Sequence, residues 1–207
     1  PASEFIDIAE KFGFTIYLDK FVLEETCKKI TELKKDNIEF GIISVNVSRN
    51  TLCEKNMLEY YEKILDKYNI KKNEIEFEVT ERNESNNISL VDKIHKLSKK
   101  YNVSIDDFGI DSSSLSMLFE HNIRTIKIDR RFIVDESDYG KRILNNILKL
   151  IKELDFEMVA EGVETLEQQK YLKSRGCNVI QGYSFCRPIS FDEYKELLKD
   201  EGDINGS

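Results

Sequence analysis

The 207-residue sequence has no tryptophan, only two prolines and no long apolar run without charges. A helix that spans a bilayer needs about 20 consecutive, mostly apolar residues, so the sequence predicts no transmembrane segment. The prolines stand at Pro1 and Pro188, and no stretch rich in proline, glycine or serine interrupts the chain between them. We therefore expect one domain at 1–200, followed by a polar, flexible tail at 201–207.

The chain is also poor in the cysteine spacings that mark metal or disulfide sites. Its four cysteines are scattered, without a CxxC or Cys/His spacing, which argues against both a zinc site and a disulfide framework. A reducing cytoplasm fits this usage, either for the protein alone or for the cytoplasmic part of a membrane-anchored parent. The net charge of -8 disfavours a nucleic-acid duplex or an anionic membrane as partner, because both need clustered Lys and Arg.

What the chain does contain is a regular alternation of strand and helix patterns. Hydrophobic residues make up 40% and charged residues 34%, which suits a domain with a sizeable core. Strands are predicted at 40–48, 74–81, 103–108, 124–129, 157–162 and 178–185. Helices are predicted at 4–12, 16–36, 52–68, 88–101, 113–121, 138–154, 165–175 and 191–200. This alternation indicates a parallel sheet covered by helices.

An open doubly wound sheet and a β/α barrel both satisfy that pattern. Fully buried parallel strands read as nearly continuous aliphatic runs, whereas these strands alternate apolar and polar residues toward their carboxyl ends. A barrel explains the alternation better, because its inward positions at the carboxyl mouth carry the chemistry. We expect a modified TIM-like (β/α) barrel. It would lack its N-terminal strands, since a closed barrel has eight strands and only six are predicted in this sequence. The missing strands would leave a sheet edge exposed.

Polar residues occupy one face of these otherwise aliphatic strands: Asn46, Glu78, Asp106, Lys127 and Glu161. Burying several carboxylates together is costly unless a cation neutralises them, and the usual cation is a divalent metal. Asn and carboxylate oxygens are ligands that Mg²⁺ and Mn²⁺ prefer. If the polar faces converge, they form a metal-binding pocket.

The run IDDFG is the most pointed of these motifs. Asp106 and Asp107 end a strand, and two consecutive aspartates at that place can face two metal ions. Gly109 lets the chain turn sharply after them. An aspartate that merely caps the next helix would account for one of the two residues only.

Lys127 lies between Ile126 and Ile128 on a strand. A lysine inside a barrel could form a Schiff base, as in an aldolase, or act as a cation that holds an anionic group and a water. Neighbouring carboxylates keep the pKa of an amine high, which disfavours the Schiff base. Trapping of a carbonyl substrate on Lys127 by borohydride would be needed to support the aldolase.

Six segments taken in order resemble the EAL-domain family of cyclic di-GMP phosphodiesterases: SVNVS, EVTE, DDFG followed by SSL, IKIDRRFI, MVAEGVET and QGYSFCRP. The resemblance covers nearly the whole chain. It implies a modified β/α barrel that hydrolyses cyclic di-GMP to linear pGpG with two Mg²⁺ or Mn²⁺ ions. It also implies a homodimer and a covalently linked upstream sensory or cyclase-like domain as partners.

The resemblance assigns roles residue by residue. It makes Asn46, Glu78 and Asp106 ligands of one metal, and Asp106 and Asp107 ligands of the second. Catalytic roles fall to Lys127, which would orient water and phosphate, to Glu161 as base or water ligand near the metals, and to Gln181 as a hydrogen-bonding group. Asp129 and Gln181 would contact substrate, and Glu81 and Glu164 would position loops around the site.

Two departures from the family pattern keep an alternative open. The Glu-Ala-Leu motif that names the family is absent, because Pro1 corresponds to a later position, so the chain as given is expected to be inactive. After DDFG, the residues Ile110, Asp111 and Ser112 replace the usual Thr-Gly-Tyr. An altered loop there favours a degenerate domain that senses cyclic di-GMP without hydrolysing it, or that serves as an interaction module.

Overall fold

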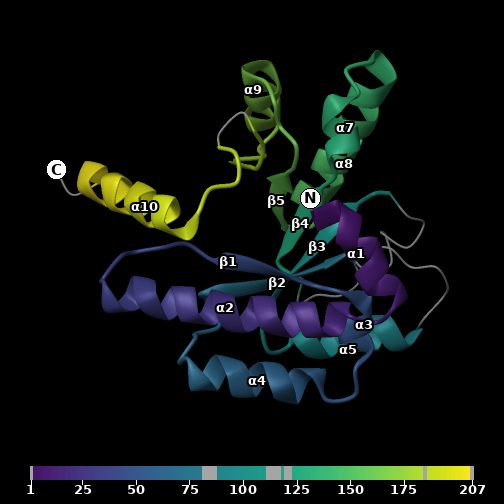
Figure 1. Cartoon of the computed structure of the whole chain (residues 1–207). Helices are drawn as coiled ribbons and strands as arrows, with labels where there is room; N and C mark the ends of the chain where they lie inside the picture. Colours follow the sequence, from purple (N-terminus) through teal and green to yellow (C-terminus); the bar gives the residue numbers. More distant parts are fainter. Residues whose placement is uncertain (1, 81–87, 111–117, 119–122, 184–185, 206–207) are drawn as a thin grey trace. The chain divides into compact units, whose positions relative to one another are not determined.

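The computed structural model describes residues 2–80, 88–110, 118, 123–183 and 186–205 (Figure 1). The chain divides into two compact units. The first comprises Pro1–Glu78, Asp92–Asn102 and Ile189–Ser207, and the second comprises Val79–Val91 and Val103–Pro188. Strands and helices alternate through both units, as the sequence predicts.

The elements of the first unit are α1 (Ala2–Lys11), α2 (Thr15–Lys35), β1 (Ile43–Val47), α3 (Arg49–Cys53), α4 (Met57–Lys67), most of β2 (Ile75–Thr80), most of α5 (Ile88–Ser98) and α10 (Phe191–Asn205). Those of the second are β3 (Asn102–Phe108), β4 (Thr125–Ile128), α7 (Arg130–Val134), α8 (Asp138–Glu153), β5 (Glu157–Ala160), α9 (Leu166–Ser174) and β6 (Val179–Ile180). The helix expected at 113–121 falls in a stretch of which only residue 118 is described.

The six strands follow one another in the sheet in chain order, from β1 to β6. Pairing of β3 with β4, β4 with β5 and β5 with β6 is parallel. Parallel neighbours need a crossover connection, and a helix supplies it between β4 and β5 and between β5 and β6. The carboxyl ends of β3, β4, β5 and β6 therefore lie at the same edge of the sheet, and Asp106, Asp107, Asp129, Glu161 and Gln181 stand at these strand ends.

In the first unit, α2 presents a buried aliphatic stripe to its neighbours. Leu23, Cys27 and Ile30 recur at helical spacing and are fully buried, while α2 contacts α4 and β1. The buried ring of Tyr61 on α4 lies 5.1 Å, centroid to centroid, from that of Phe77 on β2. The unit is held by this apolar layer, because aromatic and aliphatic burial is the main favourable term in folding.

The single helix predicted at 52–68 is wrong, because the segment forms two helices, α3 and α4. Ser48 begins α3 by accepting a hydrogen bond from the Thr51 backbone N–H, and Glu54 ends it in an extended conformation. Asp19 of α2 accepts hydrogen bonds from the Ser48 N–H at 2.8 Å and from the Thr51 hydroxyl at 2.6 Å. These long-range contacts fix where α3 starts, which periodicity alone does not reveal.

In the second unit, α8 packs its buried Leu144, Leu148 and Ile151 over the sheet and contacts β5. The helix begins at Ser137, whose hydroxyl accepts from the Gly140 N–H. Helix α9 begins with a reciprocal capping box between Thr165 and Gln168. Both helix starts are fixed locally, so the segments that lead from the strands into them have defined paths.

Helix α10 extends through Asn205, into the segment that was expected to form a tail. It is held to α2 by Lys195, which pairs with Glu32 at 3.1 Å and also with Asp36. The Lys29 ammonium lies 4.3 Å from the centroid of the Phe191 ring. These contacts place the C-terminal helix within the first unit.

Candidate metal centre

A bulge at the end of β3 turns two adjacent aspartates toward one place. Ile105 pairs with Ile126 and Phe108 with Ile128, so β3 advances three residues while β4 advances two. Asp107 absorbs the extra residue with φ of 56°, a left-handed conformation that Asp tolerates better than most residues. Strict alternation would put consecutive side chains on opposite faces, and the bulge removes that restriction.

Asp106, Asp107 and Glu161 each offer a carboxylate oxygen, and these atoms lie within 4.8 Å of one another. All three side chains are half-buried. Three convergent hard oxygen donors at this spacing fit a Mg²⁺- or Mn²⁺-sized cation and not a soft thiolate-bound metal. Asp106 and Asp107, which the sequence predicts as metal ligands, therefore lie in one cluster of carboxylates. Glu161, directly after β5, is its third member.

Lys127 lies beside this acidic cluster, defined as Asp106, Asp107 and Glu161. Its Nζ is 2.5 Å from Glu161 Oε1 and 3.9 Å from Asp106 Oδ1. Only 6% of Lys127 is exposed. A buried cation between carboxylates lowers the cost of bringing them together.

Asp129 ends β4 and begins α7, a short helix that the sequence analysis did not predict. Burial raises the pKa of Asp129, but hydrogen bonds from the Arg131 N–H, from the Asp107 side chain and from the Arg131 guanidinium outweigh it and leave the pKa lowered. The Asp129 carboxylate accepts from Arg131 N at 2.7 Å as the N-cap of α7. Asp129 is thus linked to the cluster through Asp107.

Gly162 follows Glu161 with φ of 65°, and a Cβ at this position would lie 2.4 Å from Arg130 Cγ. Arg130 in turn pairs with Glu164 at 2.7 Å. Glycine is therefore required here both by backbone conformation and by the close approach of Arg130. Arg130 is not among the site residues predicted from the sequence, although it directly follows the segment IKID at the end of β4.

Gln181 follows β6, and its backbone is well anchored. Its N–H donates to Ala160 O at 2.8 Å, and its carbonyl accepts from Val163 N at 3.1 Å. The Gln181 side chain is exposed. A Cβ at Gly182 would lie 2.2 Å from the Val163 carbonyl oxygen, so this turn holds Gln181 close to the segment that follows Glu161.

Within the described part of the second unit, the remaining predicted residues do not join the acidic cluster. Asn46 is exposed on β1, and Glu78 is buried on β2, both in the first unit. Ile110 is half-buried after Gly109. Glu81, Asp111 and Ser112 lie outside the described residues, so their roles remain predictions.

Parallel strands with covering helices and a carboxylate cluster at the strands' carboxyl ends are the arrangement of a β/α barrel, in which the site lies at this end of the strands. Residues 1–188 match the EAL domain, and the chain belongs to this family. The resemblance found in the sequence is thus confirmed. Among the described residues, no helix is long and apolar enough to cross a membrane.

Curated relatives agree with this assignment. The chain is 31% identical to the signaling protein YkoW of Bacillus subtilis over 96% of the chain and 25% of that protein. It is also 31% identical to the cyclic di-GMP phosphodiesterase NbdA of Pseudomonas aeruginosa over 94% of the chain and 25% of that protein. The chain therefore spans about a quarter of the length of these relatives.

Solved structures show the same fold. The EAL enzyme Bd1971 with cAMP and cyclic di-GMP bound superposes with a TM-score of 0.87 at 26% identity, over 96% of this chain and 56% of that one. The PaMucR phosphodiesterase in complex with cyclic di-GMP gives 0.86 at 29% identity, over 94% and 80%. The expected fold, a TIM-like barrel that lacks some of its elements, is therefore confirmed, and the alternative of an open doubly wound sheet is not.

Proposed function

We propose that the parent domain, to which this chain belongs, hydrolyses cyclic di-GMP to linear pGpG in a reaction that depends on divalent metal. The observation that carries the proposal is the acidic cluster with Lys127 against it, in a chain of the EAL family. Relatives named as cyclic di-GMP phosphodiesterases and a structure of one with cyclic di-GMP bound support the substrate. We set the aldolase alternative aside, because the Lys127 ammonium is paired with Glu161 and lies near Asp106.

Asp106, Asp107 and Glu161 would hold the metal, which we propose to be Mg²⁺ or Mn²⁺ as a pair of ions. Bound divalent cations supply neutralisation of the phosphodiester and a water of lowered pKa. In the first unit, Asn46 and Glu78 are proposed as further ligands of one ion. Lys127 lies against two of these carboxylates and offsets part of their negative charge.

The chemical step breaks one P–O3′ bond. The oxygen of a water attacks phosphorus in line with the leaving 3′ oxygen, and the 3′ oxygen leaves as a hydroxyl after it gains a proton. Glu161 would accept the proton of the water, and Lys127, which pairs with Glu161, would hold this carboxylate in position and bind a phosphate oxygen. The product therefore carries one free 5′ phosphate and one free 3′ hydroxyl.

Side chains around the cluster are assigned to substrate and loop positioning. Asp129 and Gln181 would contact the nucleotide, because both stand at strand ends next to the cluster's own strands. Glu164, held by Arg130, would fix the loop after Glu161, and Glu81 would do the same after β2. A homodimer, a linked upstream sensory or cyclase-like domain, and a cytoplasmic location complete the proposal.

The test follows pGpG formation from cyclic di-GMP by the full-length protein with Mn²⁺. We expect product with Mn²⁺, none with a chelator, and a loss of at least about a hundredfold in kcat for Asp106→Asn and Glu161→Gln. A matched control is Asp138→Asn, an exposed residue in the first turn of α8. Tight nucleotide binding by the wild type without product would overturn the proposal and support the non-catalytic sensor.

A further inference from the structure

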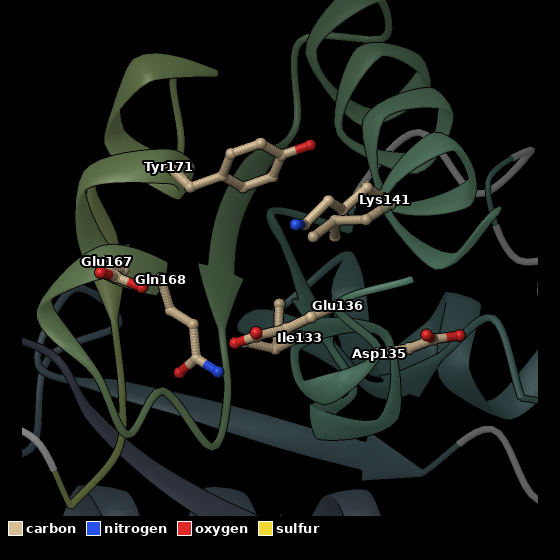
Figure 2. Close-up of a pocket in the computed structure, with 8 residues that line it drawn as sticks. Ile133, Asp135, Glu136, Lys141, Glu167, Gln168 and Tyr171 are labelled. Atoms are coloured by element: carbon tan, nitrogen blue, oxygen red, sulfur yellow. The ribbon is translucent and has the colours of Figure 1, made fainter. Parts of the chain in front are cut away.

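A cavity lies between the start of α8 and helix α9 (Figure 2). Its volume is about 160 Å³, which is too small for a cyclic dinucleotide and suits a small metabolite. The residues that line it are Ile133, Asp135, Glu136, Lys141, Leu144, Glu167, Gln168 and Tyr171. None of them belongs to the proposed phosphodiesterase site.

The base of the cavity is apolar and rigid. Ile133 and Leu144 are each only 4% exposed, so their surfaces toward the cavity belong to the packed core. The ring of Tyr171 forms one wall, and its hydroxyl donates to Asn145 Oδ1 at 2.9 Å across from α9 to α8. This bond keeps the ring in place, so the cavity offers a fixed apolar and aromatic surface.

The rim carries charges of both signs. Figure 2 shows the Lys141 ammonium and the Glu136 carboxylate turned into the cavity from one side and Glu167 on the other. Among the described residues, the structure gives none of these three side chains an ion pair. Asp135 differs, because its Oδ1 already accepts from the Ser137 N–H at 3.1 Å. The rim therefore carries one cation, Lys141, and three carboxylates, of which Asp135 already has a backbone hydrogen-bond partner.

Gln168 adds a directed donor. Its Oε1 accepts from the Glu164 N–H at 2.9 Å and the Thr165 N–H at 3.1 Å, so the amide orientation is fixed by the capping box. Figure 2 shows the amide nitrogen on the side of Glu136. The two N–H groups of this nitrogen are thus available to an acceptor in the cavity.

We propose that this cavity binds a free α-amino acid with an apolar side chain. The zwitterion matches the rim, because its carboxylate can accept from Lys141 and the Gln168 amide while its ammonium lies between Glu136 and Glu167. Its side chain would lie on Ile133, Leu144 and Tyr171. A plain amine would leave Lys141 unmatched, and a plain carboxylate would meet two carboxylates.

The location has a physical consequence for the rest of the unit. Helix α7 follows β4, which carries Lys127, and α9 follows the loop that begins with Glu161 after β5. Two walls of the cavity are therefore close in sequence to residues of the proposed metal centre. Arg130 and Glu164 already join these two segments by an ion pair. An amino acid in the cavity would join them a second time.

The test titrates the 207-residue chain with L-leucine by calorimetry and by amide NMR. We expect shifts at Ile133, Leu144 and Gln168, and binding weakened about tenfold or more for 3-methylbutylamine, 4-methylpentanoate and glycine. Each of these three probes lacks one of the matched groups. Absence of any shift with leucine at about 10 mM, or equal binding of the amine, overturns the proposal.

Variants separate the site from nonspecific binding. Lys141→Gln, and Glu136→Gln combined with Glu167→Gln, should each weaken leucine binding about tenfold or more. All three residues are exposed, so the fold should be retained, and thermal unfolding checks this. The control is Lys149→Gln, two turns further along α8 and 72% exposed. Undiminished binding by Lys141→Gln would overturn the assignment.

Discussion

Lys127 Nζ lies 2.5 Å from Glu161 Oε1, although Lys127 is on β4 and Glu161 directly follows β5. The parallel register pairs Lys127 with Val159, and the chain continues two residues further to Glu161, whose N–H donates to Ile128 O at 3.1 Å. The ladder thus brings a buried cation against a half-buried anion. In the absence of divalent metal, Lys127 is the positive charge that stabilises the acidic cluster.

Replacement of Lys127 by Met should separate the contribution of this lysine to stability without metal from its role in hydrolysis. Without divalent metal, the free energy of unfolding should fall by about 2 kcal/mol, because the carboxylates lose their cation. Mn²⁺ should bind the variant roughly tenfold more tightly than the wild type, since a competing positive charge is gone. Urea unfolding with and without Mn²⁺ measures both effects.

Lys149→Met, an exposed lysine on α8, is the matched control and should change neither quantity. Hydrolysis by Lys127→Met should be lost despite the tighter metal binding. An unchanged Mn²⁺ affinity in this variant would show that Lys127 does not neutralise the cluster.

Gly162→Ala should destabilise the second unit by about 1–3 kcal/mol, because the residue has positive φ and its new methyl group would meet Arg130. Gly41→Ala is the control, since nothing lies within 4 Å of a Cβ there. The double variant Gly162→Ala/Arg130→Ala should recover part of the loss. Thermal unfolding that ranks Gly41→Ala as the more harmful change would contradict this account.

Asp19→Ala tests whether the Asp19 carboxylate fixes the start of α3. The Asp19 carboxylate is 8% exposed and accepts from Ser48 and Thr51, so its removal leaves two donors without their charged partner. We expect a loss of about 2–3 kcal/mol in the free energy of unfolding. Asp66→Ala, exposed on α4, should cost far less, and equal losses in a urea titration would refute the capping role.

Thiol reactivity tests which surfaces are buried. Cys53 and Cys186 are exposed, whereas Cys27 and Cys177 are buried. Burial raises the pKa of Cys27 to about 12 and of Cys177 to about 11, so both remain protonated and unreactive near pH 8. A chromogenic disulfide reagent should therefore label two thiols in the folded chain and four in denaturant. Rapid labelling of all four in native buffer would show that the core is open.

The burial of these thiols also makes stability depend on pH. A folded pKa above the unfolded value of about 9 means that the thiolate forms more easily in the unfolded chain. The contribution of Cys177 to stability is fully present below about pH 9 and is lost as the pH rises through about 11. Cys177→Ala should flatten the fall in unfolding free energy over this interval, and an unchanged slope would argue against a buried thiol.

Much of the fold could be predicted because strand and helix periods are local signals. The positions of β3, β4 and β5 follow from alternating or aliphatic runs, and the family motifs supplied the order of the site residues. The break between α3 and α4 could not be predicted, because it depends on Asp19, about 30 residues away. Helix α7 was missed because its five residues are too few for a periodic pattern.

The site residues, like the fold, could be predicted from the sequence only in part. Asp106, Asp107, Lys127 and Glu161 were identified from residue type and strand position, and the structure brings them together. The reason that two consecutive aspartates share one site is the bulge at Asp107, which alternation alone would forbid. The role of Arg130 depends on packing against Gly162, a contact that no spacing in the sequence encodes.

The most direct measurement is Mn²⁺ binding, followed by electron paramagnetic resonance of the free ion, in the wild type, Asp106→Asn, Asp107→Asn and the control Asp138→Asn. The account predicts that the wild type and the control bind Mn²⁺ alike and that each cluster variant loses at least about tenfold in affinity. Undiminished Mn²⁺ binding by Asp106→Asn and Asp107→Asn would contradict the assignment of this cluster as the metal centre.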